Sequence, residues 1–264
     1  MPAVQALLAR NSIMLDTAIN HFSDDITRAR ALLAHAGTIP AGGVQDDALR
    51  AVWMMSVGAC DAYFSDAYAD LVSRAIRAKE QEPAVQVPDR FNNLKVPVTA
   101  ILRQANGGWR WRMAARELIE EENVLSLNKI KQLFNHFFRK PYKLLVADNL
   151  EPWILHRQSK QRLFAITPTR YRALNASQKG KARKAALDKL EERFELIFQR
   201  RHDCIHNCDR PKVAPQSIWD TAVGKVIEDV EFLVNRCHNA LRQEFPVYLT
   251  NLGFSAITRN RVGA

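Results

Sequence analysis

The stretch that decides the fold class reads LEERFELIFQRRHDCIHNCDRPK and occupies residues 190–212. Apolar residues recur around it at helical spacing, which predicts a long helix with one apolar face. Arg201 falls on this apolar stripe, whereas Arg200 points elsewhere, towards solvent. A guanidinium on a core-facing stripe is costly unless an acid pairs with it or it lines a site. The stripe consists of Leu187, Leu190, Phe194, Phe198 and Ile205.

The same helical spacing extends through most of the chain and predicts an all-α fold. Strand patterns and internal repeats are absent from the sequence, and Gly and Pro residues separate the helical stretches. We expect helices at about 4–36, 46–80, 111–122, 127–139, 181–205 and 217–245, the second capped by Asp46 or Asp47. The predicted architecture is a single helical domain over residues 1–264. Its bundle frame comprises about 1–80 and 181–245, and about 83–180 form a partly irregular insertion.

Composition is that of an ordinary globular protein, with 47% hydrophobic and 25% charged residues. The longest apolar run, residues 51–60, is far shorter than the ~20 residues that span a bilayer. The first residues lack a basic segment followed by an apolar one, so we expect no secretory signal and a cytoplasmic location. The cysteines are then expected to be reduced thiols that fill core space. They are Cys60, Cys204, Cys208 and Cys237.

The net charge of +10 is concentrated in residues 139–184. This segment holds 12 Lys or Arg residues and only two acids, so its net charge of +10 equals that of the whole chain. Its aromatic residues suit a polyanion with bases that can stack, such as single-stranded RNA. A solvated face that keeps the protein soluble explains the charge equally well. The candidate RNA contacts are Arg170, Arg172, Lys181, Arg183, Lys184 and, further along, Arg200.

The sequence RHDCIH at residues 201–206 places His206 five positions after Arg201. On an unbroken helix the two side chains point about 140° apart, which is unfavourable for joint action on one phosphate. Asn207 and Pro211 suggest that the helix ends near Ile205, which removes this difficulty. Two copies of the chain that meet along the stripe would also remove it.

The motif resembles the R-x4-H signature of the HEPN superfamily, with its usual polar residue directly after Arg201. The resemblance is to the ribosome-associated or defence-linked branch, and it covers the helical frame but not the insertion. It implies a helical bundle, commonly a homodimer, in which paired motifs form one ribonuclease site without a metal or other cofactor. A toxin or antiviral role and an inhibitory partner protein are further expectations. Arg30 and His35 have the same spacing, but Ala follows Arg30, and we interpret this copy as coincidence.

The residue types fit metal-independent cleavage of RNA. His206 can transfer a proton while Arg201 binds the phosphate, which gives a 2′,3′-cyclic phosphate and a 5′-hydroxyl. His202 is either a second proton-transfer group or a solvated side chain, and Asn207 is a candidate helix cap. Asp61 lies at the border of the apolar stripe in the second helix. It is either a carboxylate that fixes Arg201 or a histidine, or an ordinary surface acid.

Two other interpretations remain open. His202, Cys204, His206 and Cys208 alternate along the chain and suggest zinc, but their spacing differs from that of structural zinc sites. The second interpretation keeps the HEPN-like fold without catalysis, as a module that binds RNA, a nucleotide or a protein partner. Intact RNA recovered after salt-dependent binding is the observation that distinguishes this module from an endoribonuclease.

Overall fold

The protein is described by a computed structural model that covers residues 13–88, 111–112, 115–116, 119, 124–207, 209 and 217–263. Every regular element in these ranges is a helix, so the all-α prediction is confirmed for the part of the chain described. None of these helices is both long and apolar enough to cross a membrane. Most of the expected helix at 111–122 and the first nine residues of the one at 4–36 lie outside these ranges.

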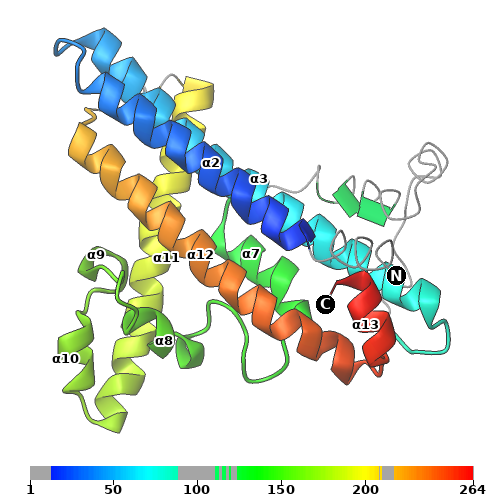
Figure 1. The fold of residues 1–264 in the computed structure, drawn as a ribbon. Coiled ribbons are helices and arrows are strands. Elements are labelled where there is room, and N and C mark those ends of the chain that lie inside the picture. Colours follow the sequence, from blue (N-terminus) through cyan, green and yellow to red (C-terminus); the bar gives the residue numbers. More distant parts are fainter. Residues whose placement is uncertain are drawn as a thin grey trace.

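Two long antiparallel helices form one side of the bundle, α2 (Ile13–Ala36) and α3 (Gly43–Gln81), as Figure 1 shows. Helix α3 begins three residues earlier than predicted, with Gly42 at its N-cap, so the expected capping by Asp46 or Asp47 is wrong. The backbone N–H of Asp46 donates to the carbonyl of Gly42. Both aspartates lie in ion-pair range of Arg50 instead, at 4.0 and 2.9 Å.

Two long C-terminal helices complete the frame, α11 (Ala176–Asn207) and α12 (Asp220–Asn251). Helix α12 packs along α2 and α3, and α11 crosses behind the bundle and contacts α3 (Figure 1). The predicted end of α12 at 245 is wrong, because the helix continues through Pro246. A proline inside a helix costs about 3 kcal/mol, and burial of Tyr248 and Leu249, two and three residues later, offsets this cost.

The middle of the chain forms short helices, and those after residue 146 lie around the N-terminal half of α11 (Figure 1). Helix α7 is shorter than the predicted 127–139, because the Asn135 side chain hydrogen-bonds both the N–H and the carbonyl of Leu144 and turns the chain. A final helix, α13 (Ala256–Val262), was not predicted from the sequence; it packs on α3 and α12. The middle elements are α7 (Leu127–Phe134), η1 (Asn135–Phe137), η2 (Ala147–Asn149), α8 (Glu151–Ile154), α9 (Gln161–Phe164) and α10 (Pro168–Arg172).

Aromatic side chains fix α7 and η1 to the bundle frame. Phe134 meets Phe64 of α3 edge to face, with ring centroids 5.7 Å apart. Phe137 makes the same kind of contact with Phe245 of α12, also at 5.7 Å. Such pairs add about 1 kcal/mol each to the burial of the rings. Since α7 also contacts α11, its N-terminal end is held beside the part of α11 that carries Arg201.

Candidate functional site

Arg201 on α11 faces Asp61 on α3. Its guanidinium Nη2 lies 3.8 Å from Asp61 Oδ2, and the two side chains are 27% and 32% exposed. The pair therefore sits at the rim of the contact between the two helices. Burial raises the pKa of Asp61, and the nearby charge of Arg201 opposes that rise. The structure thus brings together the residues that the sequence singled out as partners, and their role in a site stays a prediction.

His202 and His206 lie side by side one helical turn apart. Their ring centroids are 4.4 Å apart, with an angle of 44° between the planes. Both side chains are exposed at the C-terminal end of α11. The two imidazoles therefore form one polar surface at this end of the helix.

Helix α11 does not end near Ile205, as the sequence suggested, but continues to Asn207. His206 therefore points about 140° away from Arg201 around an unbroken helix. Ile205 is also 48% exposed rather than part of the buried stripe, while Cys204 is buried. Asp209 has a positive φ of 58° and donates its N–H to the carbonyl of Asp203.

The prediction that Arg200 points towards solvent is wrong. Its Nη2 donates to the buried Asp209 Oδ2 at 2.9 Å and to the carbonyl of Ser217 at 3.1 Å. Its guanidinium carbon lies 4.9 Å from the centroid of the Trp53 ring. Asp209 follows the last residue of α11 and Trp53 lies on α3, so the periodicity of α11 could not indicate either contact. Arg200 holds the end of α11 in place and is not a free RNA contact.

The basic residues proposed for RNA binding lie near the other end of α11. Arg183 interacts with Asp148, Glu151 and the hydroxyl of Tyr171, so its guanidinium is held within the fold. Lys184 precedes Arg201 by 17 residues, about 25 Å along the helix axis. The basic surface that these residues form is therefore separate from the Arg201 site. Its exposed members are Arg170, Arg172, Lys181 and Lys184.

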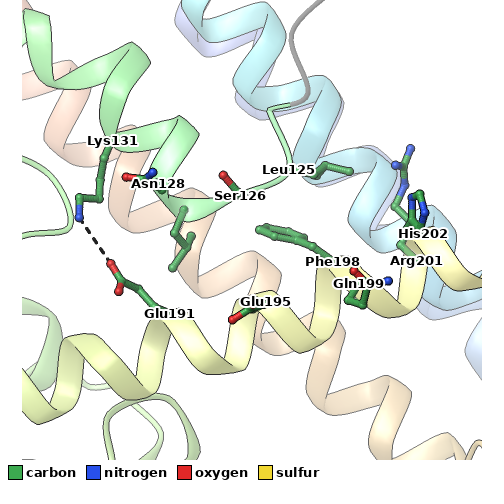
Figure 2. Close-up of a pocket in the computed structure, with 11 residues that line it drawn as sticks. Leu125, Ser126, Asn128, Lys131, Glu191, Glu195, Phe198, Gln199, Arg201 and His202 are labelled. Carbon is green, nitrogen blue, oxygen red and sulfur yellow. Dashed lines mark hydrogen bonds and ion pairs between the residues drawn. The ribbon is translucent and has the colours of Figure 1, made fainter.

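Two pockets flank Arg201. The larger, called here the α7–α11 pocket, has a volume of about 530 Å³ (Figure 2). The smaller, called the α3 pocket, has a volume of about 280 Å³ and is lined by Asp61, Ser65 and Arg116 among others. Arg201 lines both pockets, His202 lines the larger one, and His206 lines neither. Arg201 therefore lies between the α7–α11 pocket and the α3 pocket.

Most of the α7–α11 pocket was missed by the sequence analysis. The spacing of its α11 residues could have indicated it, because five of them fall within about 100° of the helix circumference. The opposite wall comes from α7 and the residues before it, a placement that only the tertiary structure reveals. The lining residues are Glu191, Glu195, Phe198, Gln199, Arg201 and His202 on α11, and Leu125, Ser126, Leu127, Asn128 and Lys131 opposite.

The thiols that the structure describes are free and buried, as predicted for core residues. Desolvation raises the pKa of Cys204 to about 11, so this thiol stays protonated at neutral pH. His202 and His206 face solvent while Cys204 is buried, so the three do not converge. Within the described residues no three His, Cys, Asp or Glu side chains come together as metal ligands. Cys208 lies outside these residues.

The second R-x4-H copy has a different environment. Arg30 forms a bidentate contact with Glu231 of α12, with Nη2 and Oε2 2.6 Å apart. Neither Arg30 nor the exposed His35 lines one of the two pockets. Arg30 therefore serves to join α2 to α12, which agrees with the interpretation of this copy as coincidence.

Comparison with protein-family models, curated proteins and solved structures found no match. The resemblance to the HEPN superfamily therefore rests on the spacing of Arg201 and His206 alone, and a function can be proposed only from the site itself.

Proposed function

We propose that this protein is an endoribonuclease that cleaves RNA without a metal ion, by attack of a ribose 2′-hydroxyl on the adjacent phosphorus. The observation that carries the proposal is the position of Arg201 between two pockets, with His202 lining one of them beside it. An RNA strand that enters both pockets passes its backbone over the guanidinium. Arginine binds phosphate through a planar fork of donors and offsets charge that develops during the reaction.

The proposed chemistry uses the imidazoles as proton carriers. One removes the proton of the 2′-hydroxyl as its oxygen bonds to phosphorus, and the bond from phosphorus to the 5′-oxygen breaks. The 5′-oxygen takes a proton from a second, protonated imidazole, so the products are a 2′,3′-cyclic phosphate and a 5′-hydroxyl. General acid–base catalysis of this kind contributes typically about 10²–10⁴-fold. His202 is the histidine next to Arg201 in the pocket, and His206 is in ring contact with it.

The proposal includes a homodimer formed along the C-terminal part of α11. Within one chain His206 points about 140° away from Arg201, so His206 of a second copy is the one suited to act on the same phosphate. The exposed apolar side chain of Ile205 lies on this part of the helix and supplies contact area. Two copies related by a twofold axis would place their motifs in one shared site.

A growth-arresting or antiviral role in the cytoplasm, with a partner protein that inhibits the cleavage, is the setting that we propose for this activity. It follows from the resemblance of the Arg201–His206 motif to that of the HEPN superfamily. The cleavage itself can be tested without knowledge of the partner, because it needs only the purified protein and RNA.

The decisive experiment incubates labelled RNA with purified protein in EDTA. We expect fragments that end in a 2′,3′-cyclic phosphate, and a loss of cutting by about 100-fold or more in Arg201→Ala and His206→Ala. His35→Ala is the matched control, since it removes the exposed histidine of the other R-x4-H copy, and it should cut like the unaltered protein. Undiminished cutting by both site variants would refute the proposal, and intact RNA after salt-dependent binding would favour a non-catalytic module instead.

A further inference from the structure

Charge is distributed unevenly along the α7–α11 pocket (Figure 2). Arg201 and His202 lie at one end. Lys131 and Glu191 lie at the other, where Nζ and Oε1 approach to 3.5 Å and neutralise each other. Glu195 lies between the two ends. The pocket therefore offers a cationic end to a phosphate and an anionic middle to a different part of the ligand.

Glu195 is an acceptor without a partner. Its side chain is exposed and makes no hydrogen bond or ion pair with any residue in the described part of the chain. Asn128 at the start of α7, on the opposite wall, also has a carboxamide without a described partner. Glu191 differs because Lys131 holds it. Glu195 in the middle of the pocket and Asn128 beside Lys131 are thus polar groups that remain to bind a ligand (Figure 2).

The distance from Glu195 to the phosphate-binding end of the pocket matches the length of one nucleotide. Glu195 precedes Arg201 by six residues, which is about 9 Å along the helix axis. A phosphate bound at Arg201 leaves the base of the same nucleotide to reach Glu195. A second phosphate is unsuitable there, because it would face the carboxylate. Phe198 and Leu125 supply apolar surface to the ring between the two ends.

The chemistry of a carboxylate selects among the four bases. An ionised carboxylate only accepts hydrogen bonds, and it can accept two side by side. Guanine alone presents two adjacent donors on one edge, its N1–H and its N2 amino group. Adenine and cytosine place an unprotonated ring nitrogen beside their amino group, and uracil places carbonyls on both sides of its N3–H. Each of these would set an acceptor against Glu195.

We therefore propose that the α7–α11 pocket binds a guanine base next to the scissile phosphate, with Glu195 as the residue that determines this specificity. Glu195 accepts from N1–H and the N2 amino group, and the carboxamide of Asn128 donates to O6. This inference rests on the proposed ribonuclease function, because the phosphate at Arg201 sets the position of the base.

The test uses ten-residue RNAs of uridine with one central guanosine, adenosine or cytidine. The cleavable set reports cutting in EDTA. A 2′-O-methyl set cannot be cut, because its nucleophile is blocked, and reports binding alone. We expect guanosine to be preferred about tenfold or more in both sets. Glu195→Gln should abolish the preference, because its amide places a donor against the guanine donors. Glu192→Gln is the matched control, since it removes the same charge outside the pocket and should keep the preference.

The two proposals fail in different ways. Cutting without a base preference, or a preference that survives in Glu195→Gln, would overturn the guanine assignment and leave the ribonuclease standing. A guanosine preference in binding that depends on Glu195, together with no cutting of any RNA, would overturn the ribonuclease and support the guanine site.

Discussion

Arg50 on α3 donates its Nε–H to Asp209 Oδ2 at 2.9 Å, across 159 residues of sequence. The same oxygen accepts from Arg200 on α11, also at 2.9 Å, and the aspartate is fully buried. Asp209 thus joins the end of α11 to α3, the helix that carries Asp61. This triad fixes the relative position of the two helices whose side chains form the Arg201–Asp61 pair.

Replacement of Asp209 by asparagine should destabilise the fold. Two guanidinium groups would lose the carboxylate that compensates them, and loss of one partner of a buried ion pair costs about 3–5 kcal/mol. We expect a decrease of this size in the free energy of unfolding, measured by urea denaturation. Asp188→Asn is the control, because Asp188 is exposed on α11, and it should change stability by less than about 0.5 kcal/mol. Equal stability of the two variants would contradict a structural role for Asp209.

Asp61→Asn should lower the RNA-cutting activity without lowering the stability of the fold. Burial holds the pKa of Asp61 above its usual value, so its ionised form is disfavoured in the folded state at neutral pH. The variant should therefore be at least as stable as the unaltered protein at pH 7. Cutting should fall by up to about 100-fold, because Arg201 loses the group that positions it. Asp61→Glu keeps the charge and should retain more cutting than Asp61→Asn.

The stability difference in Asp61→Asn should also depend on pH. Above the folded pKa of Asp61 the unaltered protein carries the full penalty of the buried charge. As pH falls through that pKa, the carboxyl becomes neutral in the folded state, and the penalty shrinks until the unfolded chain is also protonated, near its pKa of about 3.9. Urea midpoints of the two proteins should therefore converge between pH 7 and pH 4. A gap that widens on acidification would show that ionised Asp61 stabilises the fold.

Mixed dimers test whether two chains share one site. If Arg201 and His206 act from different copies, Arg201→Ala and His206→Ala are each inactive alone. A dimer with one chain of each kind keeps one of the two Arg201–His206 pairs of the shared site. Mixing should therefore restore up to a quarter of the activity, since half of the dimers are mixed and each of these has half of its pairs intact. The mixture is unfolded and refolded together, then assayed in EDTA. A mixture as inactive as its components would exclude a site shared in this way.

The exposed bases near the start of α11 should strengthen RNA binding through charge alone. Removing Arg170, Arg172, Lys181 and Lys184 together should weaken binding to single-stranded RNA. It should also flatten the dependence of log Kobs on log salt by about 0.7 for each phosphate that the variant no longer neutralises. Fluorescence anisotropy at several salt concentrations measures both quantities.

A matched control removes four exposed bases from other surfaces, at Arg28, Lys225, Arg242 and Arg261. It lowers the net charge by the same amount and should leave the salt dependence nearly unchanged. Similar slopes for the two variants would mean that the total charge, and not this surface, attracts the RNA.

The sequence alone determined the fold class and the location of the excess charge. Apolar residues at helical spacing are a local property of the chain, so the stripe through Leu190, Phe194 and Phe198 was enough to predict α11. The same pattern placed Asp61 at the edge of the apolar stripe in α3 and Arg201 on the apolar stripe of α11. The sequence could therefore suggest that the two side chains pair, because both were expected beside the contact between buried helix faces.

Only the tertiary structure decided which groups meet across the bundle. The contact of Arg200 with Trp53 joins α11 to α3, and the opposite wall of the pocket depends on Phe134 and Phe137, which fix α7 to the frame. The continuation of α12 through Pro246 likewise depends on packing further along the helix. Contacts between residues far apart in sequence leave no periodic signal, because their energy arises only when the chain has folded.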